Sequence, residues 1–335
     1  MPNHSNGSAI SARSFFALLR QAFTGENQDY TSGSIRRAVF LLAVPMILEM
    51  VMESVFALVD MYFAGKLGSA DAISTIVLTE FVLTIVYALA IGLSMAATAM
   101  VARRIGEKNP QAASKAGVQA TILSLMESGA IRIVGVIWPA EILSIMGASD
   151  ETIRIGTTYT RIIFGGNAVI VLLFMINGVF RGAGDAFMAM RSLWIANICN
   201  IILCPILVVY GLGPIPAMGV TGAAIATTIG RGVGVLYQLY HLFGARRIIK
   251  VKLADLNIDW SLIRSIFSIA WTGTLQFLIA SASWMVLGRI MASFGPIAVA
   301  GYGVAIRLIM FFLLPAWGLS NAAATLVGQN LGAQQ

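Results

Sequence analysis

Residues 46–68 read MILEMVMESVFALVDMYFAGKLG, an apolar run that carries three carboxylates, Glu49, Glu53 and Asp60. A charged side chain at the centre of a bilayer costs roughly 2.5 to 3.5 kcal/mol on insertion scales, so such groups usually face a cavity, a partner or an ion. At about 100° per residue, Glu53 and Asp60 lie roughly 40° and 20° from Glu49 around a helix, on one face. Carboxylates placed in this way can take up a proton or hold a cation.

The composition indicates that the elements carrying these acids lie in a membrane. Of the 335 residues, 58% are hydrophobic and 11% are charged, whereas an ordinary soluble domain has about 25% charged residues. The net charge of +7 comes mostly from connections between apolar runs, where basic residues set orientation rather than bind nucleic acid. We therefore expect an all-α membrane protein that contacts lipids and no nucleic acid.

Apolar stretches of about 20 residues or more predict membrane-spanning helices. The sequence has eight of them, and the short connections between them favour antiparallel neighbours. Basic residues gather in the N-terminal segment and in every second connection, which places the N-terminus and this side of a multi-pass protein in the cytoplasm, with the chain in the plasma (inner) membrane. The predicted spans are 38–63, 72–102, 116–139, 157–180, 187–210, 216–243, 262–292 and 297–328.

An internal repeat divides the chain. GLSMAATAMVARRIG at 92–106 aligns with GLSNAAATLVGQNLG at 318–332, an offset of 226. An even number of spans separates the copies, so both copies enter the membrane in the same direction and are expected to be related by an axis along the membrane normal. The second copy covers two spans, and completing it would take roughly 110 to 140 further residues. The expected divisions are a cytoplasmic tail at 1–34 with a short interfacial helix at 15–23, a six-helix lobe at 35–245, a linker at 246–263 and the start of a second lobe at 264–335.

Several stretches together resemble the multidrug and toxic compound extrusion (MATE) transporters. They are Pro45 followed by VDMYFAGKLG at 59–68, GLSMAATAMVARRIGE at 92–107, NGVFRGAGDAFMAM at 177–190, GVTGAAIAT at 219–227 and VGQNLGA at 327–333. The resemblance implies two six-helix lobes around a central cavity, and exchange of protons or sodium for organic, often cationic, compounds. It thus implies a cation-coupled antiporter, expected as a monomer, with no cofactor other than the coupling ion.

Two other functions compete with this interpretation. A lipid-linked precursor flippase of related architecture would need a cationic cavity for phosphates, and Arg132, Arg231 and Arg289 leave that alternative open. An intramembrane enzyme would need a nucleophile with a base or a metal site, and neither HExxH nor GxSxG occurs. We therefore expect neither an enzyme nor a bound metal.

The resemblance assigns Asp60 to the acid that couples cations in the first lobe, although an aspartate near a helix end can also be merely interfacial. Glu49 and Glu53 lie outside the family pattern; they either extend a proton route or pair with basic residues on other helices. In one branch of the family the position of Cys204 is an aspartate that shares the proton site, so its absence favours a proton held by Asp60 over sodium, which needs several oxygens. Asn200, one turn before Cys204, is a candidate ligand.

Further candidates concern movement and the cavity. Glu80 and Arg307 occupy equivalent repeat positions, 227 apart, and can form an ion pair that closes the two lobes on one side. Arg181 and Asp185 are expected in a cytoplasmic loop, where the charged pair pins two moving helices. Pro45 is a possible hinge, and the cavity candidates are Asn197, Cys204, Met50 and Tyr159.

Overall fold

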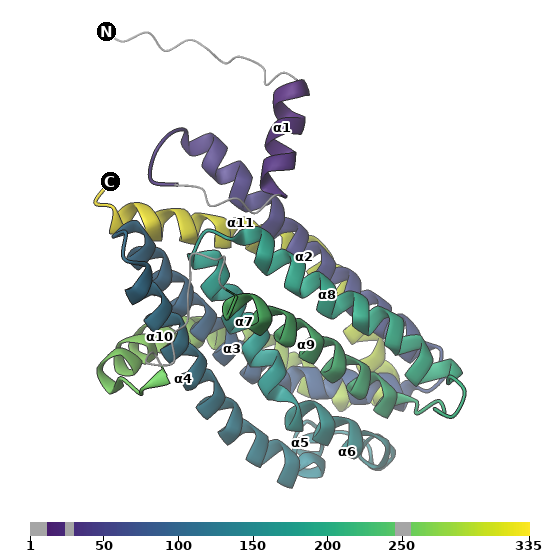
Figure 1. The fold of residues 1–335 in the computed structure, drawn as a ribbon. Helices are drawn as coiled ribbons and strands as arrows, with labels where there is room; N and C mark the ends of the chain where they lie inside the picture. The colour runs from purple at the N-terminus through teal and green to yellow at the C-terminus, as the bar shows by residue number, and fades with distance from the viewer. Residues whose placement is uncertain (1–11, 24–29, 245–255) are drawn as a thin grey trace.

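A computed structural model describes residues 12–23, 30–244 and 256–335, and these residues are almost entirely helical (Figure 1). The only pairing of extended backbone within them is an isolated bridge between Leu212 and Ile215. The elements are α1 (Ala12–Ala22), α2 (Ile35–Gly65), α3 (Ala70–Gly106), α4 (Pro110–Ile137), α5 (Pro139–Ile145), α6 (Asp150–Gly165), α7 (Asn167–Gly182), α8 (Ala186–Pro205), the π-helical turn η1 (Ile206–Tyr210), α9 (Val220–Leu242), α10 (Trp260–Ala292) and α11 (Pro296–Gly332).

The predicted tail helix and linker are only partly described. The helix expected at 15–23 is α1, which begins at Ala12 and ends at Ala22. Most of the linker expected at 246–263 lies outside the described residues, and α10 already begins at Trp260. Its start is set by Asp259, whose side chain accepts a hydrogen bond from the Leu262 backbone N–H and caps the helix.

Six of the described helices, α2, α3, α4, α8 with η1, α10 and α11, are long and apolar enough to cross a membrane. The span predicted at 157–180 is a bent pair, α6 and α7, which meet at an angle of 43° and could count as a seventh. At the break Gly166 packs against α9, where a Cβ on it would lie 2.6 Å from the methyl carbon of Thr228. The span predicted at 216–243 is α9, which is helical but falls short of the same test.

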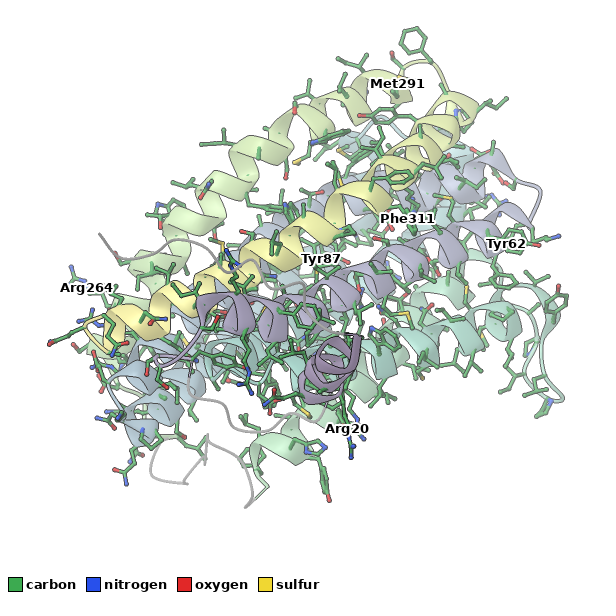
Figure 2. All side chains as sticks on the ribbon, turned by 90° about the horizontal axis from the view of Figure 1, so that it is seen from above. Arg20, Tyr62, Tyr87, Arg264, Met291 and Phe311 are labelled. Atoms are coloured by element: carbon green, nitrogen blue, oxygen red, sulfur yellow. The ribbon has the colours of Figure 1, made fainter. Side chains whose placement is uncertain are left out.

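Helix α3 lies at the centre of the packing, in contact with α4, α6, α7, α10 and α11. On its other side α2 runs along α8, and α8 runs along α9, which completes a bundle from the first part of the chain. Helices α10 and α11 pack mainly on α3 and, for α11, on α2, rather than on each other. In Figure 2 α11, which carries the labelled Phe311, lies between α10 and α2.

The repeat is visible in the contacts between α3 and α11. A Cβ on Gly106 would lie 2.0 Å from the carbonyl oxygen of Gln329, and a Cβ on Gly332 would lie 2.1 Å from the carbonyl oxygen of Arg103. The two contacts are reciprocal, since Gly106 and Gly332, and likewise Arg103 and Gln329, are equivalent residues of the two copies. Small residues are what allow helix backbones to approach so closely. We call this contact the α3–α11 seam; it lies beside the C-terminus marked in Figure 1, at the end of the molecule that carries the basic residues Arg103, Arg104 and Lys108.

Candidate functional site

Asp60 lies in α2 and points into the bundle, with 5% of its surface exposed. The thiol of Cys204, on α8 one residue before Pro205, donates a hydrogen bond to Asp60 Oδ1 at 3.3 Å. No basic side chain of the described residues lies within salt-bridge distance of Asp60. The contact with the fifth predicted span is therefore present, and the Asp60 side chain is buried.

Glu53 of α2 forms an ion pair with Arg231 of α9. Its carboxylate accepts hydrogen bonds from both terminal nitrogens of Arg231 on α9, one of them at 3.1 Å, and from Asn197 Nδ2 at 2.9 Å. The Arg231 guanidinium is buried and lies 4.9 Å and 5.6 Å from the ring centres of Phe56 and Phe174. Bidentate pairing and aromatic faces together compensate a cation in an apolar interior.

Glu49 is paired in the same manner one turn earlier in α2. Arg181 Nη1 donates to Glu49 Oε1 at 2.8 Å, and Asn177 Nδ2 donates to the same oxygen at 2.9 Å. Arg181 also donates to Ser94 Oγ at 2.9 Å, which ties α2, α3 and α7 together. Of the two alternatives for the glutamates, the geometry therefore favours pairing with basic residues on other helices.

The structure places Arg181 and Asp185 differently from the predicted loop pair. Helix α7 continues to Gly182, so Arg181 lies in its last turn with its side chain buried, where it needs a counter-charge that Glu49 supplies. Asp185 instead accepts a hydrogen bond from the Met188 backbone N–H at 3.1 Å and caps α8. The loop expectation is corrected because the turn between α7 and α8 is shorter than the sequence pattern suggested.

The predicted partners Glu80 and Arg307 do form an ion pair, 2.6 Å long, between α3 and α11. Arg307 Nε also donates to the carbonyl oxygen of Ala57 in α2 at 3.1 Å. One arginine of α11 is thus bonded to both α2 and α3. It reaches α2 three residues, or nearly one turn, before Asp60.

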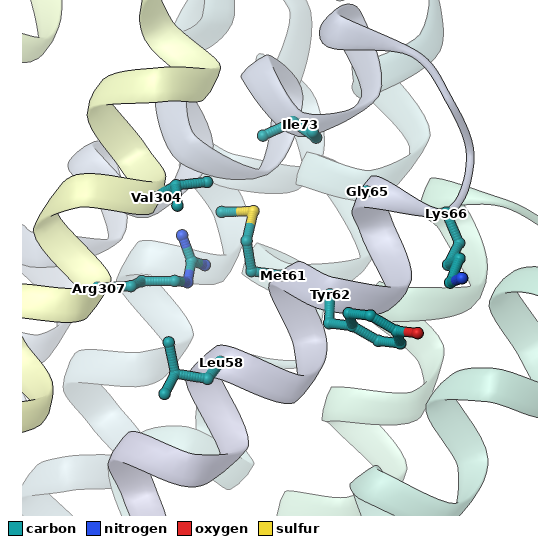
Figure 3. A pocket seen from close by; sticks show the side chains of 8 residues that line it. All are labelled: Leu58, Met61, Tyr62, Gly65, Lys66, Ile73, Val304 and Arg307. Carbon is teal, nitrogen blue, oxygen red and sulfur yellow. The ribbon is translucent and has the colours of Figure 1, made fainter.

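Arg307 also lines a pocket between α2 and α11 with a volume of about 430 Å³. Figure 3 shows Arg307 extending from α11 toward Met61, while Tyr62 and Lys66 lie at the opposite edge. The Lys66 ammonium lies 5.1 Å from the centre of the Tyr62 ring. The remaining lining residues are Leu58, Gly65, Ile73 and Val304.

The other candidates lie within the helix packing. Asn200 is buried, and its Nδ2 donates to Thr227 Oγ1 of α9 at 3.1 Å, while its Oδ1 has no partner among the described residues. Met50 and Tyr159 are buried against neighbouring helices and do not line the pocket. Pro45 lies inside a continuous α2.

The sequence interpretation missed the partners rather than the acids. The sequence pattern does not point to Thr227, Asn177 or Ser94, and it indicates Arg231 only as a possible phosphate contact. A usable signal was present, because an arginine in an apolar helix requires a nearby acid. The number of acids on one face of α2 suggested several such arginines.

Comparison with known proteins supports the sequence resemblance. The family model described as MatE matches residues 45–206 and 274–335. The chain is 25% identical to "Probable multidrug resistance protein YoeA" of Bacillus subtilis, over 92% of this chain and 67% of that protein. It is 28% identical to an "FAD transporter" of Shewanella oneidensis, over 91% of this chain and 67% of the relative. The chain thus spans about two thirds of the length of these relatives.

Two solved structures resemble the fold closely. One is an outward-facing conformation of a multidrug resistance MATE family transporter of the MOP superfamily, with a TM-score of 0.78 and 27% identity, over 94% of this chain and 68% of that one. The other is a MOP superfamily transporter from Pyrococcus furiosus, described by the reverse polarity of its binding pocket. It has a TM-score of 0.81 and 28% identity, over 91% of this chain and 67% of that one.

Proposed function

This chain belongs to the MatE family of multi-pass membrane transporters, and from that premise we propose that it works as a cation-coupled antiporter that exports organic compounds by alternating access. Residues 35–245 form its first lobe, and residues 264–335 begin the second. The N-terminus lies in the cytoplasm, in keeping with the basic residues at that end. In this mechanism one central site is exposed alternately to the two sides as the lobes move against each other.

The observation that carries the proposal is the different pairing of the acids around α2. Glu49, Glu53 and Glu80 each bind an arginine, whereas Asp60 is bonded to a neutral thiol. Four carboxylates thus face the three guanidinium groups of Arg181, Arg231 and Arg307. One carboxylate remains without a cation, and it is Asp60.

A buried carboxylate without a counter-charge is unfavourable in a membrane, so the cluster favours uptake of one monovalent cation. Binding that cation makes the cluster neutral, and losing it restores one negative charge. We propose a stoichiometry of one cation per cycle in this lobe, held at Asp60. The paired glutamates keep their arginines in place and take no part in the exchange.

The proposed cation is a proton. Sodium requires several oxygen ligands at once, and the nearest partner of Asp60 is the Cys204 sulfur, a poor sodium ligand. Asn197 Oδ1 and Asn200 Oδ1 are buried amide oxygens of α8 without a hydrogen-bond partner among the described residues, but neither is bonded to Asp60. A proton needs only the Asp60 carboxylate.

The experiment uses the full-length protein in sealed vesicles loaded with a fluorescent organic cation. Export is measured under an imposed pH gradient without sodium, and under a sodium gradient at equal pH. Export driven by the pH gradient alone supports the proposal. Export that requires sodium assigns the cluster to sodium, and export that ignores both gradients removes the antiporter proposal.

The family resemblance favours organic cations as substrates, but one observation favours a second candidate, the export of organic anions. The pocket between α2 and α11 is lined by two basic side chains, Lys66 and Arg307, and by no acidic one. One relative is named an FAD transporter, and FAD is an aromatic anion. Calorimetry with an aromatic sulfonate and a matched aromatic ammonium compound distinguishes the two candidates by which one binds.

The flippase alternative receives less support. Arg231 is buried against Glu53, whereas Arg132 and Arg289 are exposed on α4 and α10. The described part of the chain therefore does not gather these three arginines around a common cavity for phosphates.

A further inference from the structure

The α3–α11 seam is bordered by a residue that precedes the bundle. Tyr30 lies before α2 and is partly buried. It packs against an apolar cluster formed by Leu42, Ala43 and Met46 of α2, Ala186 of α8 and Ala322 of α11. A side chain that precedes α2 thus packs against a cluster to which helices of both repeat copies contribute.

Hydrogen bonds connect Tyr30 both to the turn between α7 and α8 and to α11. Its hydroxyl donates to the carbonyl oxygen of Gly184, in the turn between α7 and α8, at 3.4 Å. Its own carbonyl oxygen accepts from Asn330 Nδ2 of α11 at 3.3 Å. Beside it Gln329 Nε2 donates to the carbonyl oxygen of Gly182 at 3.0 Å. The first bundle and the end of α11 are therefore bridged by Tyr30 next to the seam itself.

The fit around the ring leaves little space. Gly184 has a φ of +85°, and a Cβ at this position would lie 2.9 Å from Tyr30 Cε2. Burial and the nearby Asp185 carboxylate raise the pKa of Tyr30 to about 12, so its hydroxyl remains a donor at physiological pH. A glycine in the left-handed region, where other residues are strained, is what lets the ring lie against this turn.

Helix α1 and the residue after it also contact α8 and α2. The ring of Phe23, directly after α1, meets the ring of Phe187 on α8 edge to face, with centres 6.0 Å apart. Arg37 Nη2 of α2 donates to Gln21 Oε1 of α1 at 2.8 Å. The residues at the end of α1 are therefore attached both to α8 and to α2.

We propose that Tyr30 is a gate residue, which holds the α3–α11 seam closed at the basic end and must leave its site before that end can open. The inference rests on the proposed alternating-access function, because opening at this end separates α11 from α3 and from the α7–α8 turn. Those are the elements that Tyr30 joins. The residue acts by positioning α11 and touches neither the coupling ion nor the substrate.

The test measures the seam directly. Spin labels are placed at Gln111, exposed at the start of α4, and at Gln334, exposed just after α11, in full-length protein in lipid nanodiscs. Cys199 is replaced by serine in this background, and the fully buried Cys204 is kept. Distance distributions are recorded without substrate or gradient, so the readout does not depend on the proposed transport activity.

Tyr30→Ala is expected to raise the population of long Gln111–Gln334 distances by at least about tenfold, because it loses the apolar packing of the ring in addition to one hydrogen bond. Tyr30→Phe keeps the ring and is expected to shift the distribution less. The matched control is Tyr240→Ala, which removes an exposed tyrosine ring from α9 and should leave the distribution unchanged.

A distribution in Tyr30→Ala that equals the parent distribution overturns the proposal. If Tyr30→Ala does not fold, Asn330→Ala decides, since it removes the donor to the Tyr30 carbonyl, together with a bond to the Leu326 carbonyl within α11, and should shift the population in the same direction. If the parent protein shows no gradient-driven export but Tyr30→Ala shifts the distance distribution, only the proposed function fails. If the parent protein exports normally but Tyr30→Ala leaves the distance distribution unshifted, only the gate proposal fails.

Discussion

The thiol of Cys204 donates a hydrogen bond to Asp60 Oδ1 across 3.3 Å, inside a bundle where the other acids of α2 are bonded to arginines. A thiol is a weak, neutral donor, so this contact orients the carboxylate without supplying a charge. Asp60 is therefore held in position and left available for a cation. The three glutamate–arginine pairs around it set the electrostatic background for that exchange.

Replacing Cys204 should affect export through this orientation. We expect Cys204→Ser, which keeps a donor, to export at close to the parent rate, and Cys204→Ala to lose several-fold because Asp60 loses its hydrogen bond. The measurement is the initial rate of export from vesicles under a pH gradient. Cys199→Ala on the same helix is the control, and equal rates for Cys204→Ala and Cys199→Ala would rule out the orienting role.

The Glu53–Arg231 pair should matter for stability. Glu53→Gln leaves Arg231 buried without its counter-charge, which typically costs about 3 to 5 kcal/mol. The double variant Glu53→Gln/Arg231→Gln removes both charges and should recover part of that loss. Unfolding of the purified protein in detergent measures both, with Glu151→Gln as the control because its pair with Arg154 is exposed. Additive losses in the double variant would show that the two residues are not coupled.

The Glu80–Arg307 pair joins α3 of the first copy to α11 of the second. If only the attraction between the two charges matters, exchanging the acidic and the basic residue should preserve the function of the pair. Glu80→Arg and Arg307→Glu are each expected to lower export at least tenfold, since like charges then face each other. The double exchange should restore a substantial part of the rate. Failure of the exchange to restore export, with correct folding confirmed by chromatography, would assign Arg307 a role that needs its bond to the Ala57 carbonyl.

Asp259 provides a pH-dependent contribution outside the spans. The hydrogen bond from Lys115, 2.6 Å long, and then the bond from the Leu262 backbone N–H hold the pKa of Asp259 below its usual value. Because the folded-state pKa is lowered, the contribution to stability is present above the unfolded-state value of about 3.9 and is lost as the pH falls through the folded-state value. Asp259→Asn keeps a capping side chain and removes the charge.

Melting temperatures of the parent and Asp259→Asn between pH 3 and pH 7 test this contribution. The parent is expected to melt slightly higher near pH 7, and the two curves should converge toward pH 3. The size of the effect is small because the pair is partly exposed. A difference that stays constant across the range would place the effect in the cap rather than in the charge.

Much of the fold could be predicted from the sequence, for identifiable reasons. Apolar runs long enough to span a bilayer predict the helices, because a helix satisfies its backbone hydrogen bonds within one segment in lipid. The repeat predicted that Glu80 and Arg307 are related, and they form an ion pair. The bend between α6 and α7 is not predicted, because the apolar run at 157–180 continues through the break at Gly165 and Gly166.

The pairing of the acids could be predicted only as alternatives. The spacing of Glu49, Glu53 and Asp60 places them on one face, but it does not say which helices lie opposite. Arg181 illustrates the difficulty, because glycines around it suggested a loop, whereas α7 extends through it and buries it against Glu49. Tyr30 carried no signal at all, since its contacts with Gly184 and Asn330 bridge residues 154 and 300 positions away.

The most direct test of the central claim, that Asp60 is the group that exchanges the coupling cation, is export by Asp60→Asn. The full-length variant is placed in vesicles, and two quantities are measured: export driven by a pH gradient without sodium, and exchange of labelled for unlabelled substrate without any gradient. We predict that Asp60→Asn loses gradient-driven export and keeps exchange, because the lobes still move but no proton is carried. Gradient-driven export that persists at the parent rate in Asp60→Asn would contradict the assignment.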